Sequence, residues 1–354
     1  MLSRRDHTMN FYRKNQFCLY KNRRKQSGIS LVEVLVSLVI SLFLLGGIIQ
    51  VFLGNKATHK FSSALSQVQE NGRFAMDAIS RDLRSAGDWG CINFNPTDAT
   101  TINNTTINNI NNNLVGEEGY IAAIHDFIAN SPIVGTNDID GVNTSDTITL
   151  SGSKPGQVNV SAPFSATTMN YITTNSISFF ADGDIALITR CGSNDLLIPQ
   201  EADIFRVTSV DTSANRLNHT VTLSQQYEND ATIMELQTVA YSIEEGASGE
   251  PALFRSLFND NQEFIEGVEN MQILYGIDTT SDAFANQYVT ANNVANFRNV
   301  VSVRVMLLVR SFENFVIDQA QTYTFNGNVV MASDRRIRRV FTNTIALRNR
   351  IGIL

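Results

Sequence analysis

A single carboxylate, Glu33, lies at the start of the longest apolar stretch of this chain, five residues after Gly28. From Val34 to Asn55 there are 22 consecutive uncharged residues. A helix of that length spans roughly 30 Å, the thickness of the hydrocarbon of a bilayer. A carboxylate at such a boundary is penalised unless a positive charge pairs with it. Ion pairing is therefore the chemistry expected of Glu33, and the alternative is an acid at the membrane edge without a partner.

The apolar segment inserts into a membrane in spite of this acid. Residues 29–53 include 18 Leu, Ile, Val and Phe residues, which contribute on the order of −9 kcal/mol against roughly +3 kcal/mol for one acid. The preceding 28 residues carry eight Lys or Arg residues and one acid, Asp6. This bias predicts a cytoplasmic N-terminus and a C-terminal bulk across the membrane. A secretory signal peptide is the alternative, but residues 54–57 offer no convincing cleavage site.

The segment Gly28-Ile29-Ser30-Leu31-Val32-Glu33 resembles the processing motif of type IV prepilins. The resemblance implies that a prepilin peptidase cleaves between Gly28 and Ile29 and methylates the new amine of Ile29, where phenylalanine is usual. It also implies that Glu33 pairs with this amine on a neighbouring subunit during assembly. Because the leader is long, Met9 is a second candidate start beside Met1.

An amphipathic helix is predicted to continue the apolar one over residues 54–87. Apolar or small residues recur every three or four positions, which is typical of one buried stripe: Phe61, Leu65, Val68, Gly72, Met76, Ile79, Leu83 and Ala86. The opposite face is polar: Gln67, Glu70, Arg73, Asp77, Arg81 and Arg84. Gly87 is the expected end of the helix. Gly72 and the pair Gly46-Gly47 are expected weak points, each costing about 1 kcal/mol against alanine.

Residues 88–354 are predicted to form a β-rich globular head. Expected strands cover residues 147–150, 177–180, 184–189, 204–210, 220–223, 236–243, 300–310 and 340–348. Residues 101–113 form an asparagine-rich loop. Strands that follow one long helix indicate an α+β fold, with an antiparallel sheet packed on the amphipathic part of the helix.

Later blocks narrow the resemblance to PilW-type minor pilins. These blocks are residues 69–77, residues 81–87, Gly90-Cys91, Gly183-Asp184-Ile185, Glu266-Gly267-Val268-Glu269, Leu274-Tyr275-Gly276-Ile277-Asp278 and Leu347-Arg348-Asn349-Arg350. They are scattered over most of residues 28–350 in the order of the family, with the asparagine-rich loop as the main addition. The resemblance implies a type IV pilin-like fold.

Cysteine usage fits an exported head. Cys18 leaves with the leader, so the mature chain keeps Cys91 and Cys191. In an oxidising periplasm these two residues are predicted to form a disulfide, and two free thiols are the alternative. No metal site or cofactor is expected, because the cysteines are isolated and the histidines lack ligand spacing. The segment 138–141 resembles part of a calcium loop, but threonines occupy its first and twelfth positions, where acids are needed.

No catalytic or phosphate-binding motif is found in the sequence, so no enzymatic activity is expected. Removing the leader changes the formal net charge from −7 to −14, which argues against a general nucleic-acid surface. The basic run from Arg335 to Arg339 is a candidate for contact with DNA or an acidic subunit. A surface or edge-protecting role is preferred for it, because the run adjoins a strand.

These observations predict a minor pilin that takes part in assembly of a type IV pilus, for twitching motility, adhesion or DNA uptake. Its expected partners are other minor and major pilins, the prepilin peptidase, the inner membrane and the pilus assembly machinery. It would be held in the inner membrane with a periplasmic head before it enters the pilus. The alternatives are a minor pseudopilin of a type II secretion system and a membrane-anchored periplasmic binding domain.

Overall fold

The computed structural model describes residues 28–88, 90, 110–112, 131–137, 144–163, 167–190, 202–257, 260–280 and 282–350. The chain forms two compact units, residues 1–56 and residues 57–354. Helix α1 (Leu31–Ser85) has 55 residues and contributes to both units. The helix ends just before Gly87, whose φ of 77° is the left-handed conformation that commonly terminates helices.

The second unit buries one stripe of α1, as the sequence predicts. Val68, Ile79 and Leu83 have at most 1% of their surface exposed. The predicted polar face is exposed throughout. Phe61 is the exception to the predicted stripe, because 42% of its surface is exposed.

The larger sheet has nine strands, and its main order is β1-β7-β6-β10-β11-β12, with β3 and β4 also paired to β10 and β2 paired to β3. The strands are β1 (Ile110–Asn112), β2 (Ile133–Thr136), β3 (Thr147–Ser153), β4 (Val158–Asn159), β6 (Ile185–Arg190), β7 (Ala202–Arg206), β10 (Ala231–Glu245), β11 (Pro251–Leu257) and β12 (Asp260–Glu266). Only β1 and β7 pair in parallel within the described sheets.

The second sheet has four strands in the order β14-β13-β15-β18. These are β13 (Val268–Ile277), β14 (Gln287–Val289), β15 (Val300–Arg310) and β18 (Arg338–Ala346). Two small sheets complete the described strands: a hairpin of β16 (Thr322–Phe325) with β17 (Asn328–Met331), and a sheet of β5 (Tyr171–Thr173), β9 (Arg216–Asn218) and β8 (Ser209–Asp211). Three short 3-10 helices, η4 (Ala291–Asn293), η5 (Phe297–Asn299) and η6 (Arg348–Arg350), lie near β15 and after β18.

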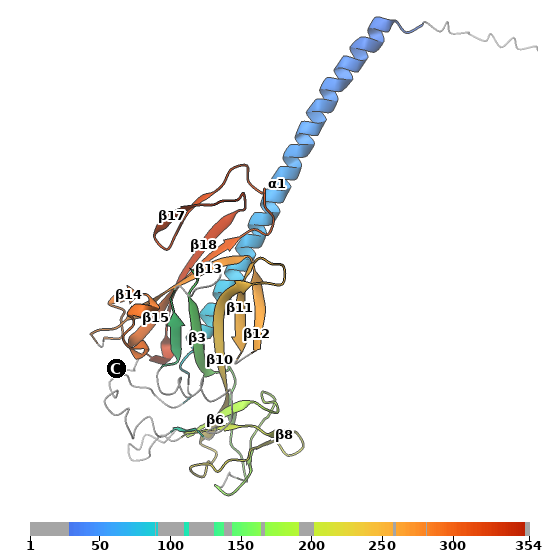
Figure 1. Cartoon of the computed structure of the whole chain (residues 1–354). Helices are drawn as coiled ribbons and strands as arrows, with labels where there is room; N and C mark the ends of the chain where they lie inside the picture. The colour runs from blue at the N-terminus through green and yellow to red at the C-terminus, as the bar shows by residue number, and fades with distance from the viewer. Residues whose placement is uncertain are drawn as a thin grey trace, which may run out of the picture. The chain divides into compact units, whose positions relative to one another are not determined.

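Two hydrophobic cores lie in the part of the head that the structure describes. The first joins α1 to residues of β3, β10, β11, β13, β15 and β18, and Figure 1 shows these strands gathered around the C-terminal part of the helix. The second core is built from residues between Val158 and Ile233. Strand β10 belongs to both, because its first residues pair with β6 and its later residues pair with β3 and β11.

Two predicted strands are wrong. Residues 177–180 form a turn closed by a 3.1 Å hydrogen bond from the Phe180 amide to the Ile177 carbonyl. Residues 220–223 form no strand, although Leu223 is buried in the second core. Both segments are loops whose apolar side chains pack on this core. Their hydrophobicity therefore does not indicate a strand.

A third predicted strand, residues 204–210, is divided between β7 and β8. The Val207 amide bonds the Asp184 carbonyl and the Thr208 amide bonds the Asn218 carbonyl, so the chain changes sheets between them. The strand predicted over residues 300–310 matches β15. With one long N-terminal helix and antiparallel sheets, the α+β, pilin-like fold class is confirmed.

Candidate functional site

The predicted processing residues lie directly before α1. Gly28 and Ile29 belong to no helix or strand, and 77% of the surface of Ile29 is exposed. Ser30 caps the helix, because its hydroxyl oxygen accepts a hydrogen bond from the Glu33 amide at 3.3 Å. The Ser30 carbonyl accepts from the amides of Glu33 and Val34 at 3.0 and 3.2 Å. A serine followed three residues later by glutamate is a known helix-start pattern, which the sequence analysis did not use.

Glu33 lies in the first turn of α1, and its side chain is exposed. Its carboxylate has no hydrogen-bond or ion-pair partner in the part of the chain that the structure describes. The two serines that follow are satisfied locally: Ser37 donates to the Glu33 carbonyl and Ser41 to the Ser37 carbonyl, each at 2.7 Å. Glu33 is the one charged side chain between Leu31 and Asn55. Because its carboxylate is exposed and has no partner in the described part of the chain, it is available for an external cation.

The surface around the N-terminal half of α1 is apolar and uncovered. Every large apolar side chain from Leu31 to Leu53 has roughly half or more of its surface exposed. The helix is long and apolar enough to cross a membrane. Apolar patches of this extent are normally covered by lipid or by another protein.

A polar contact set fixes the other half of α1 to the head. The Asp82 carboxylate accepts a hydrogen bond from the Tyr241 hydroxyl at 2.6 Å and forms an ion pair with Arg255 at 3.0 Å. Asn71 donates to the Glu266 carbonyl at 3.0 Å, and Asn343 donates to the Ser80 hydroxyl at 3.1 Å. These residues form no local sequence pattern and are not predicted above. The available signal was that Asp82 lies three positions after Ile79, on the margin of the buried stripe.

Gly72 has a specific packing role and is not a weak point of the helix. A Cβ atom placed on Gly72 would lie 2.1 Å from Cε2 of Phe341. The aromatic ring of Phe341 therefore packs against bare helix backbone, which only glycine provides. The expectation that Gly72 costs the helix stability is corrected: the residue lets β18 approach α1.

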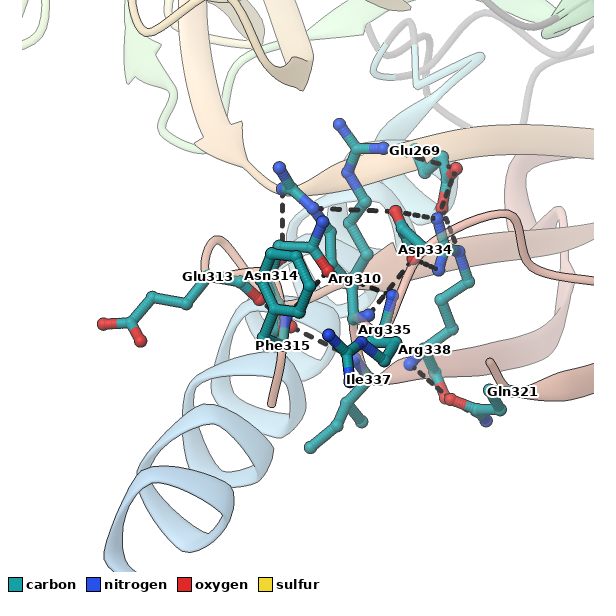
Figure 2. Close-up of polar contacts among 12 residues, drawn as sticks. Glu269, Arg310, Glu313, Asn314, Phe315, Gln321, Asp334, Arg335, Ile337 and Arg338 are labelled. Atoms are coloured by element: carbon teal, nitrogen blue, oxygen red, sulfur yellow. Dashed lines mark hydrogen bonds and ion pairs between the residues drawn. The ribbon is translucent and has the colours of Figure 1, made fainter. Parts of the chain in front are cut away.

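The basic run does not form a free cationic surface (Figure 2). Arg338 is 4% exposed, and it forms ion pairs with Glu269 at 2.7 Å and with Asp334 at 2.5 Å. Arg336 pairs with Glu250 at 2.7 Å. Hydrogen bonds from Arg338 and Arg336 respectively hold the pKa of Asp334 and of Glu250 below their ordinary values.

Within this run, Arg335 stacks on Phe315 with its guanidinium 4.2 Å from the ring centre, and only Arg339 is both exposed and without such a contact in the described part of the head. The preference for a surface role is thus wrong for Arg336, which pairs with Glu250, and for Arg338, which joins β18 to Glu269 of β13. Because acids of the head neutralise Arg336 and Arg338, the run also lacks most of the free positive charge that a DNA contact would require.

The cluster around Asp203 resembles a catalytic triad by composition only. Asp203 is fully buried, and it accepts hydrogen bonds from the Ser224 hydroxyl at 2.7 Å and the Tyr227 hydroxyl at 2.8 Å. His219 Nδ1 donates to the Val221 carbonyl at 2.9 Å and does not contact Ser224. Burial lowers the pKa of His219. Without a serine–histidine bond, the cluster lacks an activated nucleophile.

Other predicted sites fall partly or wholly outside the described residues. Cys91 and Cys191 both lie there, so their disulfide stays a prediction. Of the asparagine-rich loop, Ile110–Asn112 is described as β1. The candidate calcium loop is described at its ends, where the hydroxyls of Thr136 and Thr147 hydrogen-bond at 2.6 Å across a strand pair. No cluster of metal-ligating side chains occurs within the described ranges.

Two family models match the chain. The model of the type IV pilus-assembly protein W, PilW, matches residues 240–349. The model of the prokaryotic N-terminal methylation motif matches residues 23–49. No curated protein matches the chain.

The matches fall on the two parts that the geometry singles out. The methylation motif encloses Gly28, Ile29 and Glu33, and the PilW match runs from the end of β10 through β18, over most strands of the first core. Both families are structural components of pili and not enzymes. The helix, the antiparallel head and the two matches together support a type IV prepilin-like protein of the PilW type, similar to the minor pilins of type IV pili.

Proposed function

We propose that this minor pilin takes part in initiating type IV pilus assembly together with other minor and major pilins, and that the pilus serves twitching motility, adhesion or DNA uptake. One observation carries the proposal. Helix α1 exposes an apolar surface from Leu31 to Leu53 that bears a single uncompensated carboxylate, Glu33, in its first turn. Lipid covers such a surface before assembly, and the helices of neighbouring subunits cover it afterwards.

Processing creates the partner for that carboxylate. A prepilin peptidase cleaves after Gly28 on the cytoplasmic side of the inner membrane and methylates the amine of Ile29. The cationic leader supports this orientation, with the head in the periplasm. The match to the methylation motif over residues 23–49 supports the cleavage position.

Pairing between subunits then follows from charge and dielectric. The amine at Ile29 lies two residues before the first residue of its own helix, so in a stack of staggered helices it reaches the Glu33 carboxylate of a neighbour. An ion is severely penalised in hydrocarbon unless it is paired. Docking therefore removes two unpaired charges at once, and a helix inserted out of register leaves both of them exposed to lipid.

The proposal is tested by deleting the gene and restoring it on a plasmid. We expect few or no surface pili in the deletion strain, normal secretion of type II substrates, and recovery of both pili and motility on complementation. Loss of secretion with normal piliation would instead assign the protein to a type II secretion system as a minor pseudopilin. If neither pili nor secretion changes, a membrane-anchored binding domain becomes the better account.

A further inference from the structure

Strand β18 has an open edge. It is the last strand of its sheet, in the order β14-β13-β15-β18, and it pairs with β15 over all nine of its residues without a register shift. No strand in the described part of the chain pairs with its other side. Figure 1 shows β18 beside helix α1.

Contacts at both ends of β18 show which backbone groups face this open edge. The Ile337 carbonyl accepts from the Ser311 amide, and the Leu347 amide donates to the Val301 carbonyl, so these odd-numbered residues face the β15 side. Arg338 faces the other way, toward Gln321. Because strand residues alternate, the amides and carbonyls of Val340, Thr342 and Thr344 are directed to the open edge.

Gln321 already imitates a neighbouring strand at the first position of this edge. Its side-chain nitrogen donates to the Arg338 carbonyl at 2.9 Å, and its side-chain oxygen accepts from the Arg338 amide at 2.8 Å. A side-chain amide thereby makes the same donor and acceptor pair that a peptide group would make. Figure 2 shows Gln321 at this position. No such side chain covers Thr342 or Thr344 within the described part of the head.

A groove of about 710 Å³ runs along this open edge, between β18 and the exposed face of α1. It is lined on the helix by residues between Ser66 and Arg84 and on the strand by Phe341, Thr342 and Asn343. The helical wall is about 27 Å long at 1.5 Å per residue. An extended segment of roughly eight residues, at about 3.3 Å per residue, has the same length.

Two other sheet edges in the described part of the head carry protective features that residues 340–346 of β18 lack. Strand β14 has three residues. Strand β12 begins with four exposed polar residues, and its pairing with β11 contains a register shift. Short edges, charged side chains and bulges are the usual ways in which proteins prevent unwanted pairing. A long, regular and uncovered edge therefore indicates a strand that is paired in the working assembly.

We propose that β18 is extended by a strand from a different subunit of the pilus, which lies in the groove and hydrogen-bonds to Thr342 and Thr344. This inference rests on the proposed function, because it assumes assembly with other subunits. Among the charged residues that line the groove, Asp77 is already paired with Arg81 at 3.6 Å. Two basic side chains, Arg73 and Arg84, and one acidic side chain, Glu70, remain, so the groove carries a net positive charge. The incoming strand is thus expected to place an acidic side chain toward the helix.

A second copy of β18 fits the groove poorly. Full antiparallel pairing of two such strands is centred on Thr342, and it places Arg339 of the copy opposite Ile345. That end of β18 lies close to the end of α1, where Asn349 donates to the Arg84 carbonyl at 3.3 Å. Arg339 of the copy would therefore come near Arg84 with no acid between them. Repulsion between these two like charges disfavours a symmetric dimer.

The test uses two substitutions at one position in the full-length chain. Thr342→Pro removes the outward amide but none of the hydrogen bonds to β15, and proline is tolerated at open edges. Thr342→Val keeps the amide and has nearly the same shape. We expect surface pili to fall at least tenfold with the proline variant and to remain within twofold of wild type with the valine variant.

Thermal unfolding of both purified variants in detergent establishes whether the proline variant folds. If it does not fold, hydrogen exchange of the wild-type chain decides the question. We expect the Thr342 and Thr344 amides to exchange freely in the isolated protein and to become protected at least 100-fold in sheared pili.

Normal piliation by a folded Thr342→Pro variant, or unchanged exchange in pili, would overturn the strand pairing while leaving the proposed function intact. A disulfide-linked homodimer formed by a Thr342→Cys variant in cells would overturn the choice of a different subunit. Normal piliation of the deletion strain itself would refute the proposed function instead.

Discussion

Glu33 has a local role in its own helix, beside the intersubunit role proposed for it. In its own helix it is the third residue after the Ser30 cap, where the positive end of the helix dipole favours an acid. That local effect contributes about 0.3–1 kcal/mol at an exposed site. A local contribution of this size does not explain an acid in an apolar segment, since its insertion costs roughly 3 kcal/mol. This difference is the reason for proposing a partner of Glu33 outside the chain.

Substitutions at Glu33 separate the two roles. Glu33→Ala and Glu33→Gln should insert and be processed normally, but both should reduce pilus assembly at least tenfold, because neither keeps the negative charge. Ser30→Ala, which removes only the cap, should assemble nearly as wild type. Pilus counts by electron microscopy and immunoblots of the membrane fraction provide the measurements. Wild-type piliation by Glu33→Gln would show that charge pairing is not the role of this residue.

His219 is a second residue whose charge state matters. It is 2% exposed, its Nδ1 bonds the Val221 carbonyl, and its Nε2 has no hydrogen-bond partner within the described part of the head. Burial lowers its pKa below the ordinary value of 6.5. As the pH falls through 6.5, the unfolded chain takes up a proton before the folded chain does. The stability is therefore fully present above this pH and decreases below it.

We expect the urea midpoint of the detergent-solubilised protein to fall between pH 7.5 and pH 5.5. His219→Asn should flatten this pH dependence, because asparagine can still donate to the Val221 carbonyl and does not titrate. His59→Gln, at an exposed position of α1, supplies the matched control substitution. An equal slope in wild type and His219→Asn would contradict the assignment.

At the scale of elements, the contact between α1 and β18 depends on Gly72. Alanine normally stabilises an exposed helix by about 1 kcal/mol relative to glycine. Here the added methyl group would overlap the ring of Phe341, at 2.1–2.5 Å from three of its carbons. Forced overpacking typically costs about 1–3 kcal/mol. Steric overlap therefore outweighs helix propensity at this position.

Gly72→Ala should accordingly lower the melting temperature by several degrees, whereas propensity alone predicts a rise. Phe341→Leu replaces the aromatic ring with a smaller side chain and should relieve the overlap. Adding Gly72→Ala to this variant should therefore lower its melting temperature little. A double-mutant cycle by thermal unfolding measures this coupling. Additive effects of the two substitutions would show that they do not contact each other.

The sequence predicts those elements that a local pattern can specify. The α1 stripe and the alternating β15 are periodic over many residues, so the predictions at Val68, Ile79 and residues 300–310 are confirmed. Residues 177–180 were assigned wrongly as a strand because short apolar segments cover cores as loops as well as strands. The motif around Gly28 and Glu33 was visible because all of its residues are contiguous.

Long-range pairs left no such signal. Asp82 and Arg255 are 173 positions apart, and no local pattern connects them. The same is true of Arg338 and Glu269, which are 69 positions apart. A basic run looks like an exposed surface until the acids that neutralise it are located, and these acids lie on other strands.

At the scale of the whole molecule, the two cores of the head differ in whether the PilW family model matches them. The PilW match covers most strands of the first core, which holds α1, whereas the second core, from Val158 to Ile233, lies outside it. The part of the head that is similar to PilW is therefore the part that packs on α1.

The proposed pairing of Glu33 requires removal of the cationic leader, because only then does an amine exist at Ile29. Mass spectrometry of the N-terminal peptide from the membrane-fraction protein measures this removal directly. We expect a mature chain that begins with N-methylated Ile29. Recovery of the native protein with residues 1–28 still attached would contradict it.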